Sequence, residues 1–380
     1  MIKVILLIDC ASEHDRKLLR GMMRYSKENG PWLFYRLSSD QRLGENREEW
    51  VMEWAKKWGA DAIIGRWNDD KLSLLDDLPI NIVLQNNKSR SKTFSNLTGD
   101  YFGTGRMAAQ YFKQKCFVEY AFFGLRGIVW SEERCSGYRQ EVENNGGHFS
   151  VYLESAEGDS MEQILHWLKS LPKPVALFCC DDAHANIVVD VCRVAGIRVP
   201  DEIAVLGVDN DELLCSISDP RLSSIVMDVE RGGYMVCKLL HENLVSGSFK
   251  PFNVSISPLM VQERESTSLM TLSDPYARTI VNLIDEKYAE NLQMSELLLS
   301  VPLSRRSIEM RFKKATGYTI YQYLLKVRVD HMAHRLLTTD RSYLDIAYEV
   351  GFHDLANVSR TFKKFKGCSP QEYLRKYCDI

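Results

Sequence analysis

The sequence contains no apolar run long enough to cross a membrane or to act as a secretory signal. Its first apolar run, Val4 to Ile8, follows a single lysine and is only five residues long, whereas a membrane-spanning helix needs about 20 apolar residues. We interpret this run as a buried first strand. The sequence therefore predicts a soluble, cytoplasmic protein with no membrane partner.

The sequence also lacks the cysteine and histidine spacings that hold metal ions. None of its ten cysteines forms a C-x-x-C pair, and none has a histidine at ligand spacing. This pattern is typical of buried thiols in a reducing compartment, so we expect no metal site. The cysteines are Cys10, Cys116, Cys135, Cys179, Cys180, Cys192, Cys215, Cys237, Cys368 and Cys378.

The motifs of the familiar enzyme classes are missing as well. There is no Walker A loop, no G-x-S-x-G elbow, no H-E-x-x-H helix and no complete G-x-G-x-x-G turn; Gly103-Thr104-Gly105 lacks the third glycine. We therefore expect no catalytic residue and no cofactor. A sugar-processing enzyme is the less favoured alternative.

The charge of the chain is divided unequally along its length. The 380 residues carry a net charge of −3, but from Pro275 to Ile380 there are 17 Lys and Arg against 12 Asp and Glu, so this part is basic and the rest acidic. A basic module joined to an acidic one is expected when only the basic part meets a polyanion. The split favours nucleic acid as a partner of the C-terminal part.

Short apolar runs alternate with helix-length amphipathic segments through the first 263 residues. This alternation predicts an α/β fold with parallel sheets covered by helices. In such folds ligands bind beyond the carboxyl ends of the strands. The expected strands contain Val4 to Ile8, Ala62 to Ile64, Ile80 to Leu84, Tyr120 to Phe123, Val175 to Cys179 and Ala204 to Val208.

The pattern changes after Pro258. A polar, Ser- and Thr-rich stretch ends at Asp274-Pro275, where the residue before proline is pushed out of helical geometry. Beyond it only helical signals remain. We therefore predict an α/β domain over residues 1–263, a linker over 264–275 and an all-α domain over 276–380.

The run "LDIAYEVGFHDLANVSRTFKKFKGCSP" predicts a helix-turn-helix. Ile346 and Ala347 can end the apolar face of a short helix, Gly351 can supply the turn, and Asp354 is a good N-cap for the next helix. On that helix Val358, Phe362 and Phe365 share the buried face, whereas Asn357, Arg360 and Lys364 share another. Asn and Arg near an exposed helix start suit base reading in the major groove.

A similar unit precedes it in "MSELLLSVPLSRRSIEMRFKKATGYT". Ser304 is the expected N-cap, and Ile308 and Phe312 form the buried stripe. The segment Ile320 to Leu337 reads as one long helix that would hold the two units about 34 Å apart, at successive major grooves. The outer face carries the expected DNA contacts Arg305, Arg306 and Glu309, with Lys313 and Lys314 near phosphates.

These two units resemble the DNA-binding module of the arabinose-regulator (AraC/XylS) family over roughly residues 275–380. The match is closest from Ile346 to Pro370, and it implies a transcription regulator that binds double-stranded operator DNA. Two positions depart from the family pattern: Pro302 stands where the first turn often has glycine, and Ala356-Asn357-Val358 replaces an aromatic stretch. A helical bundle with a solvated basic face is the alternative.

The strongest stretch of the α/β part is "VALFCCDDAHANIVVDVCRVAGIRVPDEIAVLGVDNDELL". It places Asp181 and Asp182 after one expected strand and Asp209 with Asn210 after the next. Carboxylates at strand ends accept charge-assisted hydrogen bonds from sugar hydroxyls. The stretch resembles the sugar-binding core of LacI/GalR repressors and type I periplasmic binding proteins, which implies two lobes with the ligand between them.

This resemblance implies Arg134, Asp181 and Asp209 as sugar ligands. Asp15 and Arg16 are added because they follow the first expected strand, and Trp67 and Trp130 because they could stack on a pyranose ring. Two alternatives stay open: the tryptophans are core residues, and Asp15 and Asp182 are helix N-caps.

The fusion of both parts in one chain resembles regulators of pentose-utilisation operons, and "DRKLLRGMMRY", "VWSEERCSGYR" and "GVDNDELL" carry this likeness. It implies a monosaccharide effector, with D-xylose favoured and another pentose or related sugar as the alternative. It favours an activator over a repressor, and an activator would contact RNA polymerase. We expect a homodimer joined through the effector domains. We expect sugar binding to close the lobes and bias the placement of the DNA-binding modules.

Overall fold

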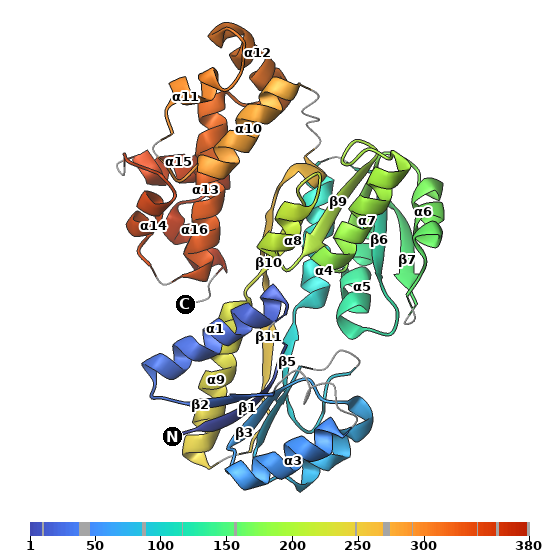
Figure 1. Ribbon diagram of the computed structural model, residues 1–380, viewed down its shortest axis with the longest axis vertical. Helices are drawn as coiled ribbons and strands as arrows, with labels where there is room; N and C mark the ends of the chain where they lie inside the picture. The colour runs from blue at the N-terminus through green and yellow to red at the C-terminus, as the bar shows by residue number, and fades with distance from the viewer. Residues whose placement is uncertain are drawn as a thin grey trace. The chain divides into compact units, whose positions relative to one another are not determined.

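The computed structural model divides the chain into two units, Met1–Thr267 and Ser268–Ile380 (Figure 1). Ser266 and Thr267, which lie inside the predicted linker range, are fully buried in the first unit, and Ser266 Oγ donates to the carbonyl of Val205 at 2.6 Å. The structure describes residues 1–380 except 10, 38–45, 86–88, 116, 156–157, 248, 269–273, 291, 340, 355–356 and 378–380.

The first lobe of unit 1 is built on an all-parallel sheet of six strands. Its helices are α1 (Glu13–Glu28) and α9 (Val229–Ser246) on one face and α3 (Arg47–Trp58) on the other, together with the short 3-10 segment η1 (Asp69–Asp77). The strands in spatial order are β11 (Asn253–Ile256), β5 (Ser95–Gly99), β4 (Asn81–Leu84), β3 (Ala62–Gly65), β1 (Lys3–Leu7) and β2 (Leu33–Arg36).

The second lobe repeats this plan, except that its edge strand β12 runs antiparallel to β10. Its strands in spatial order are β12 (Pro258–Gln262), β10 (Ser223–Met227), β9 (Ile203–Val208), β8 (Val175–Cys179), β6 (Glu119–Leu125) and β7 (His148–Glu154). Its helices are α4 (Tyr101–Gln114), α5 (Val129–Asn144), α6 (Met161–Ser170), α7 (Asp182–Ala195), α8 (Glu212–Ile217) and the 3-10 turn η2 (Glu265–Thr267).

The predicted α/β class and all six predicted strands are confirmed. The strands that the sequence did not reveal are either edge strands or contain polar residues, as β5 and β10 do. In β10, Ser223 and Ser224 are fully buried because other parts of the chain satisfy their hydroxyls: Ser223 Oγ donates to the carbonyl of Arg264. Buried polar residues hide a strand from any search for apolar runs.

The chain crosses between the lobes three times, after β5, β10 and β11 (Figure 1). One apolar cluster runs through both lobes and contains residues of α1, α9, α4 and α5, whereas α3 covers a separate cluster in the first lobe. The lobes are therefore joined by a common core as well as by the three crossings.

The described cysteines of unit 1 are buried, as predicted. Cys135, Cys179, Cys180, Cys192, Cys215 and Cys237 carry no disulfide, and Cys368 of unit 2 is half-buried. Cys10, Cys116 and Cys378 lie outside the described residues. No helix among the described residues is long and apolar enough to cross a membrane.

Unit 2 is all-helical, as predicted, and α13 (Ile320–Thr338) is its central element (Figure 1). The long helix expected from Ile320 to Leu337 is thus confirmed. Helices α10, α11 and α12 precede α13 and form the first half of unit 2, and α14, α15 and α16 follow it and form the second half. Their bounds are α10 (Pro275–Lys287), α11 (Met294–Leu299), α12 (Arg305–Thr316), α14 (Tyr343–Glu349), α15 (Val358–Lys366) and α16 (Pro370–Tyr377).

Glycines let helices α4 and α5 approach each other closely in the second lobe. A Cβ atom at Gly137 would lie 2.0 Å from the carbonyl oxygen of Phe102, and one at Gly105 would lie 2.1 Å from that of Arg134. Glycine inside a helix costs about 1 kcal/mol relative to alanine, so this approach is the physical reason for both residues. The close approach also fixes the position of Arg134, on α5, relative to α4.

We expect Gly137→Ala to destabilise unit 1 by about 1–3 kcal/mol, because the added methyl group forces two packed helices apart. Urea unfolding followed by circular dichroism measures the effect. Ser136→Ala, an exposed position on the same helix, serves as the control and should change the unfolding free energy far less. Equal stability of the Gly137 variant and the native protein would contradict the close packing.

Candidate functional site

A group of polar side chains lies where the two lobes face each other. We call Asp15, Arg66, Gln85, Arg134 and Asp209 the polar cluster. Asp15 lies in the first turn of α1, while Arg66 and Gln85 directly follow β3 and β4. In the second lobe Arg134 lies on α5 and Asp209 directly follows β9. The cluster therefore gathers residues from the carboxyl ends of strands in both sheets.

Contacts within and between the lobes connect these residues. Arg66 Nη2 donates to Asp15 Oδ1 at 3.4 Å, and Gln85 Nε2 lies 3.3 Å from His14 Nε2. His14 spans the lobes, because its Nδ1 also lies 3.6 Å from Asp209 Oδ1. Lys17 adds a second link, since its Nζ donates to the carbonyl of Asp209 at 3.1 Å.

Each member of the polar cluster keeps one buried polar atom without a hydrogen-bond partner. A buried donor or acceptor that makes no hydrogen bond costs about 1–3 kcal/mol, so such atoms are normally satisfied by water or by a ligand. Their concentration at one place makes the polar cluster a candidate ligand site. Within the described part of the chain these atoms are Asp15 Oδ2, Arg66 Nε, Gln85 Oε1, Arg134 Nε and Asp209 Oδ1.

Arg134 is held firmly although it is almost completely buried. Its guanidinium lies between the rings of Tyr101 and Trp130, at 5.4 and 5.3 Å from their centroids, and its Nη1 donates to the carbonyl of Cys180 at 2.5 Å. Nη2 lies 3.8 Å from Asp209 Oδ1. These contacts leave its Nε, which has no partner among the described residues, available to a ligand.

Asp209 is an ionised carboxylate in this environment. Burial alone would raise its pKa, but the imidazole of His14, 3.6 Å away, and the positive charges of Arg134 and Lys17 outweigh burial and lower the pKa to about 2. Its backbone has φ of +95°, a conformation that is costly for a non-glycine residue. Such strain persists only where the surrounding structure holds the residue in place.

Asp182 holds the loop that carries Asp209. Its carboxyl group contacts Ser224 Oγ at 2.6 Å and accepts from the backbone N–H of Asp211 at 2.8 Å. Burial raises the pKa of Asp182 well above its usual range. Asp182 therefore positions Asp209 through the two residues that follow it.

Some of the predicted sugar ligands lie in the polar cluster and others do not. Asp15, Arg134 and Asp209 belong to it, and Trp130 stacks on Arg134. Arg16 instead binds Glu13, with 2.9 Å between Nε and Oε2, and Asp181 is bound by His184 Nδ1 at 2.6 Å.

The structure corrects the predicted role of Trp67. This side chain is 4% exposed and packs in the apolar cluster under α3, and its Nε1 donates to the carbonyl of Lys71 at 2.9 Å. The core alternative therefore holds for Trp67, because its ring is covered by protein and is not offered to a sugar.

The N-cap alternatives are resolved differently for each aspartate. Ser12 is the N-cap of α1 and accepts from the backbone N–H of Asp15, so Asp15 is not the cap. Asp181 is the N-cap of α7 and accepts from the backbone N–H of His184 at 2.8 Å, so the cap is Asp181 and not Asp182.

The sequence analysis missed His14, Arg66 and Gln85. Two of them carry a signal, since Arg66 follows the strand "AIIG" and Gln85 follows "NIVL", and ligands of parallel sheets bind beyond the carboxyl ends of the strands. His14 gave no such signal. Its role follows from a contact with Asp209, which is 195 positions away in the sequence.

The second helix-turn-helix consists of α14 and α15. Gly351 has φ of +91°, and a Cβ atom there would lie 2.6 Å from the carbonyl oxygen of Tyr288, so only glycine fits the turn. Asp354 is not the N-cap. Helix α15 begins at Val358 with Asn357 in the cap position, and Asn357 Nδ2 donates to Asp354 Oδ2 at 2.8 Å.

Helix α15 separates a buried face from a basic exposed face, as predicted. Val358 and Phe362 are buried, Phe365 is half-buried, and Asn357, Arg360 and Lys364 are exposed. Gly367 ends the helix in a left-handed conformation with φ of +79°. Ala356 lies outside the described residues.

The first helix-turn-helix consists of α11 and α12. Ser304 caps α12 as predicted, and Ile308 and Phe312 are fully buried. The turn before it accommodates Pro302 with a backbone hydrogen bond from Leu303 to Val301 at 2.9 Å. The predicted DNA contacts Arg305, Arg306, Glu309 and Lys313, and Lys314 with them, lie on the outer side of α12, where Arg305 Nε donates to Glu309 Oε1 at 2.9 Å.

Comparisons with known families match both parts of the chain. A family described as a periplasmic binding protein-like domain matches residues 109–267, and a family described as a helix-turn-helix domain matches residues 300–376. The xylose operon regulatory protein of Escherichia coli K12 is 26% identical over 98% of this chain and 96% of its own length. That of Haemophilus influenzae is 25% identical over 98% and 97%.

Solved structures share the fold. The structure of the xylose-binding transcription activator XylR is 24% identical, covers 98% of both chains and has a TM-score of 0.60. A complex of the transcriptional regulator CelR with cellobiose is 19% identical, covers 70% of this chain and 84% of that one, and has a TM-score of 0.58. The first match extends the likeness to both units in the same order.

We expect Asp209 to stabilise unit 1 in a pH-dependent manner. Because folding lowers the pKa of this carboxyl group from 3.8 to about 2, its contribution of about 2 kcal/mol is present above pH 5 and is lost as the pH falls toward 2, with about half gone at pH 3. Urea unfolding of the native protein and Asp209→Asn from pH 3 to 8 measures the difference. A difference that stays constant over this range would contradict the assignment.

Proposed function

Since the chain is a transcription regulator that joins a periplasmic-binding-protein-like domain to a helix-turn-helix domain, we propose that it responds to D-xylose and activates xylose-utilisation genes. The helix-turn-helix domain binds DNA, and the other domain binds a small-molecule effector. D-xylose is favoured by the likeness, over nearly the whole chain, to xylose operon regulatory proteins of two bacteria.

The observation that carries the sugar proposal is the set of unpartnered buried atoms in the polar cluster. It offers three acceptors, on Asp15, Gln85 and Asp209, and two N–H donors, on Arg66 and Arg134. A pentose presents hydroxyl groups that both donate and accept, so one ligand can satisfy both kinds of atom. Ionised Asp209 accepts the charge-assisted hydrogen bonds that hold a sugar hydroxyl most firmly.

We infer that Asp15, Arg134 and Asp209 contact the sugar directly. Trp130, whose ring stacks on Arg134, covers the sugar. His14, Arg66 and Gln85 join them from the first lobe. Arg16 and Asp181, although predicted from the sequence, are outside this proposal because their charged groups are already paired with Glu13 and His184.

We infer that α12 and α15 are the recognition helices. On α15 Asn357 and Arg360 read base edges and Lys364 contacts phosphate; on α12 Arg305, Arg306 and Glu309 read bases and Lys313 contacts phosphate. Their exposure supports these roles. Arg305 is paired with Glu309 at 2.9 Å, which keeps both side chains on one face before DNA arrives.

The working form that we propose is a cytoplasmic homodimer joined through the effector domains. Sugar binding between the lobes favours the closed arrangement, and a ligand shifts such an equilibrium only by its preference for one state. An activator would also contact RNA polymerase. Effector and operator affinities are then coupled, so that operator affinity changes with the sugar concentration.

Calorimetric titration of the full-length protein with D-xylose, L-arabinose, D-ribose and D-glucose tests the effector. We expect D-xylose to bind most tightly, and Asp209→Asn to weaken its binding at least tenfold because the charged acceptor is lost. Asp190→Asn, an exposed carboxylate of the same lobe, is the matched control and should bind as the native protein does. Tighter binding of another sugar would identify that sugar as the effector in place of D-xylose. If none of the four sugars bound, the proposal would be rejected.

Arg360→Ala tests base reading on α15. Loss of one bidentate contact to guanine should weaken operator binding by about 1–3 kcal/mol and leave binding to random DNA nearly unchanged. Lys364→Ala should weaken both alike, because a phosphate contact carries no sequence information. Fluorescence anisotropy at two salt concentrations measures both. An equal loss on random DNA for Arg360→Ala would assign Arg360 to phosphate instead.

A further inference from the structure

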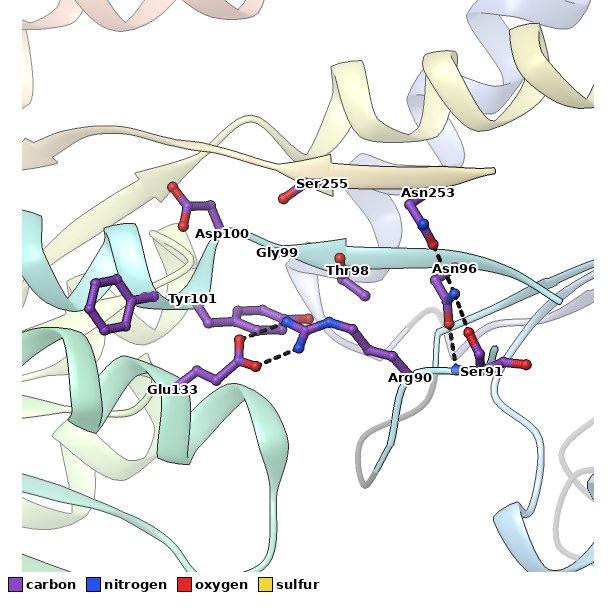
Figure 2. A pocket seen from close by; sticks show the side chains of 11 residues that line it. Arg90, Ser91, Asn96, Thr98, Gly99, Asp100, Tyr101, Glu133, Asn253 and Ser255 are labelled. Carbon is purple, nitrogen blue, oxygen red and sulfur yellow. Dashed lines mark hydrogen bonds and ion pairs between the residues drawn. The ribbon is translucent and has the colours of Figure 1, made fainter. Parts of the chain in front are cut away.

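A second polar region lies beside the chain crossings of unit 1, separate from the polar cluster. It is a cavity of about 450 Å³ whose wall includes the polar edge of β5 and β11, the start of α4, and Arg90 with Glu133 (Figure 2). Arg90 belongs to the loop before β5 in the first lobe, and Glu133 belongs to α5 in the second. The two side chains therefore meet across the lobes.

The pairing of Arg90 with Glu133 has the geometry of a strong ion pair. Arg90 Nη2 donates to Glu133 Oε2 at 2.6 Å while Nη1 contacts Oε1, so both arms of the guanidinium face both carboxylate oxygens (Figure 2). A two-pronged contact of this kind is more directional than a single ion pair.

The first lobe holds Arg90 in place through a local hydrogen-bond network. Asn96 on β5 accepts from the backbone N–H of Ser91 at 2.8 Å and donates to its carbonyl at 2.9 Å, and its amide also donates to Asn253 Oδ1 on β11 at 2.8 Å (Figure 2). The residue that follows Arg90 is thus attached to both strands that lead into the second lobe.

On the other side of the ion pair, Glu133 is the neighbour of Arg134 in the polar cluster. Tyr101 connects the two arginines, because the guanidinium of Arg90 lies 6.0 Å and that of Arg134 lies 5.4 Å from the centroid of its ring. Any contact that fixes Glu133 against the first lobe consequently also fixes the turn of α5 that presents Arg134 to Asp209.

We propose that Arg90 and Glu133 are positioning residues that hold the lobes together around the effector site and so set the effector affinity. This inference rests on the proposed function, in which the effector binds between closed lobes. The pair touches no effector. It acts by raising the fraction of protein that is closed before binding, and the apparent dissociation constant of a ligand falls in proportion to that fraction.

Two features distinguish this pair from an ordinary surface ion pair. It spans the lobes, so separating them must break it, whereas Arg106 and Glu141 pair at 3.6 Å within the second lobe. It also gives the binding of an uncharged sugar a dependence on salt, because ions screen exposed charges. A neutral ligand has no such dependence through its own contacts.

Glu133→Gln tests the proposal in the full-length protein by calorimetry with D-xylose at 20 and 500 mM NaCl. We expect about a two- to fivefold weaker affinity at low salt, the range for a partly exposed pair, and a smaller salt dependence than in the native protein. Glu141→Gln on the same helix is the matched control and should leave both quantities unchanged.

Charge reversal separates the pair from the individual side chains. Arg90→Glu places two carboxylates opposite each other and should lower the affinity further than Glu133→Gln, and adding Glu133→Arg should restore most of it. Failure of the double variant to recover, with an unchanged unfolding midpoint, would overturn the proposal. So would an affinity and salt dependence of Glu133→Gln that match the native protein.

A measurement without sugar keeps this test independent of the effector. Hydrogen exchange followed by mass spectrometry should show faster exchange in Glu133→Gln than in the native protein over Asp209 to Asp211 and the first turn of α5, because the lobes separate more often. If the native protein bound no sugar, the proposed function would fail while this readout still decided the role of the pair. Equal exchange rates would overturn it.

Discussion

The buried contact between Arg134 and Asp209 is the interaction on which the ligand site depends. Two charges in a largely apolar setting are costly unless each is compensated. The compensation comes from many elements: Tyr101 and Trp130 stack on the arginine, the carbonyl of Cys180 accepts from it, and His14 reaches Asp209 from the opposite lobe. The site is therefore a property of both lobes together, and neither lobe could hold it alone.

The need to compensate Arg134 and Asp209 also links the effector site to the closure of the two lobes that we infer. Buried polar atoms of the polar cluster that have no protein partner can bond to a ligand, so binding favours the arrangement in which the lobes meet. The Arg90–Glu133 pair, which joins the two lobes, favours the same arrangement. Unit 2 uses a different principle, because α12 and α15 pack on the single helix α13 through apolar side chains and leave their basic faces outward.

The sequence predicted well those elements whose residues interact locally. The six apolar strands, the helix from Ile320, the cap at Ser304 and the turn at Gly351 are each marked by residue types within a few positions, and all are confirmed. Polar strands such as β10 escaped prediction because distant residues satisfy their buried hydroxyls. For Trp67 the core alternative holds, because the side chains that cover its ring come from elements that the sequence does not mark as its neighbours.

Sequence alone thus determined the fold class of each part, the two turn-helix units and the basic faces of α12 and α15, because spacing along one helix decides which side chains share a face. Only the tertiary structure decided the membership of the ligand site. It brought His14 of the first lobe to Asp209 of the second, with Gln85 beside His14 and Arg66 beside Asp15. Contacts between residues this far apart in sequence exist only when two sheets and three crossings align them.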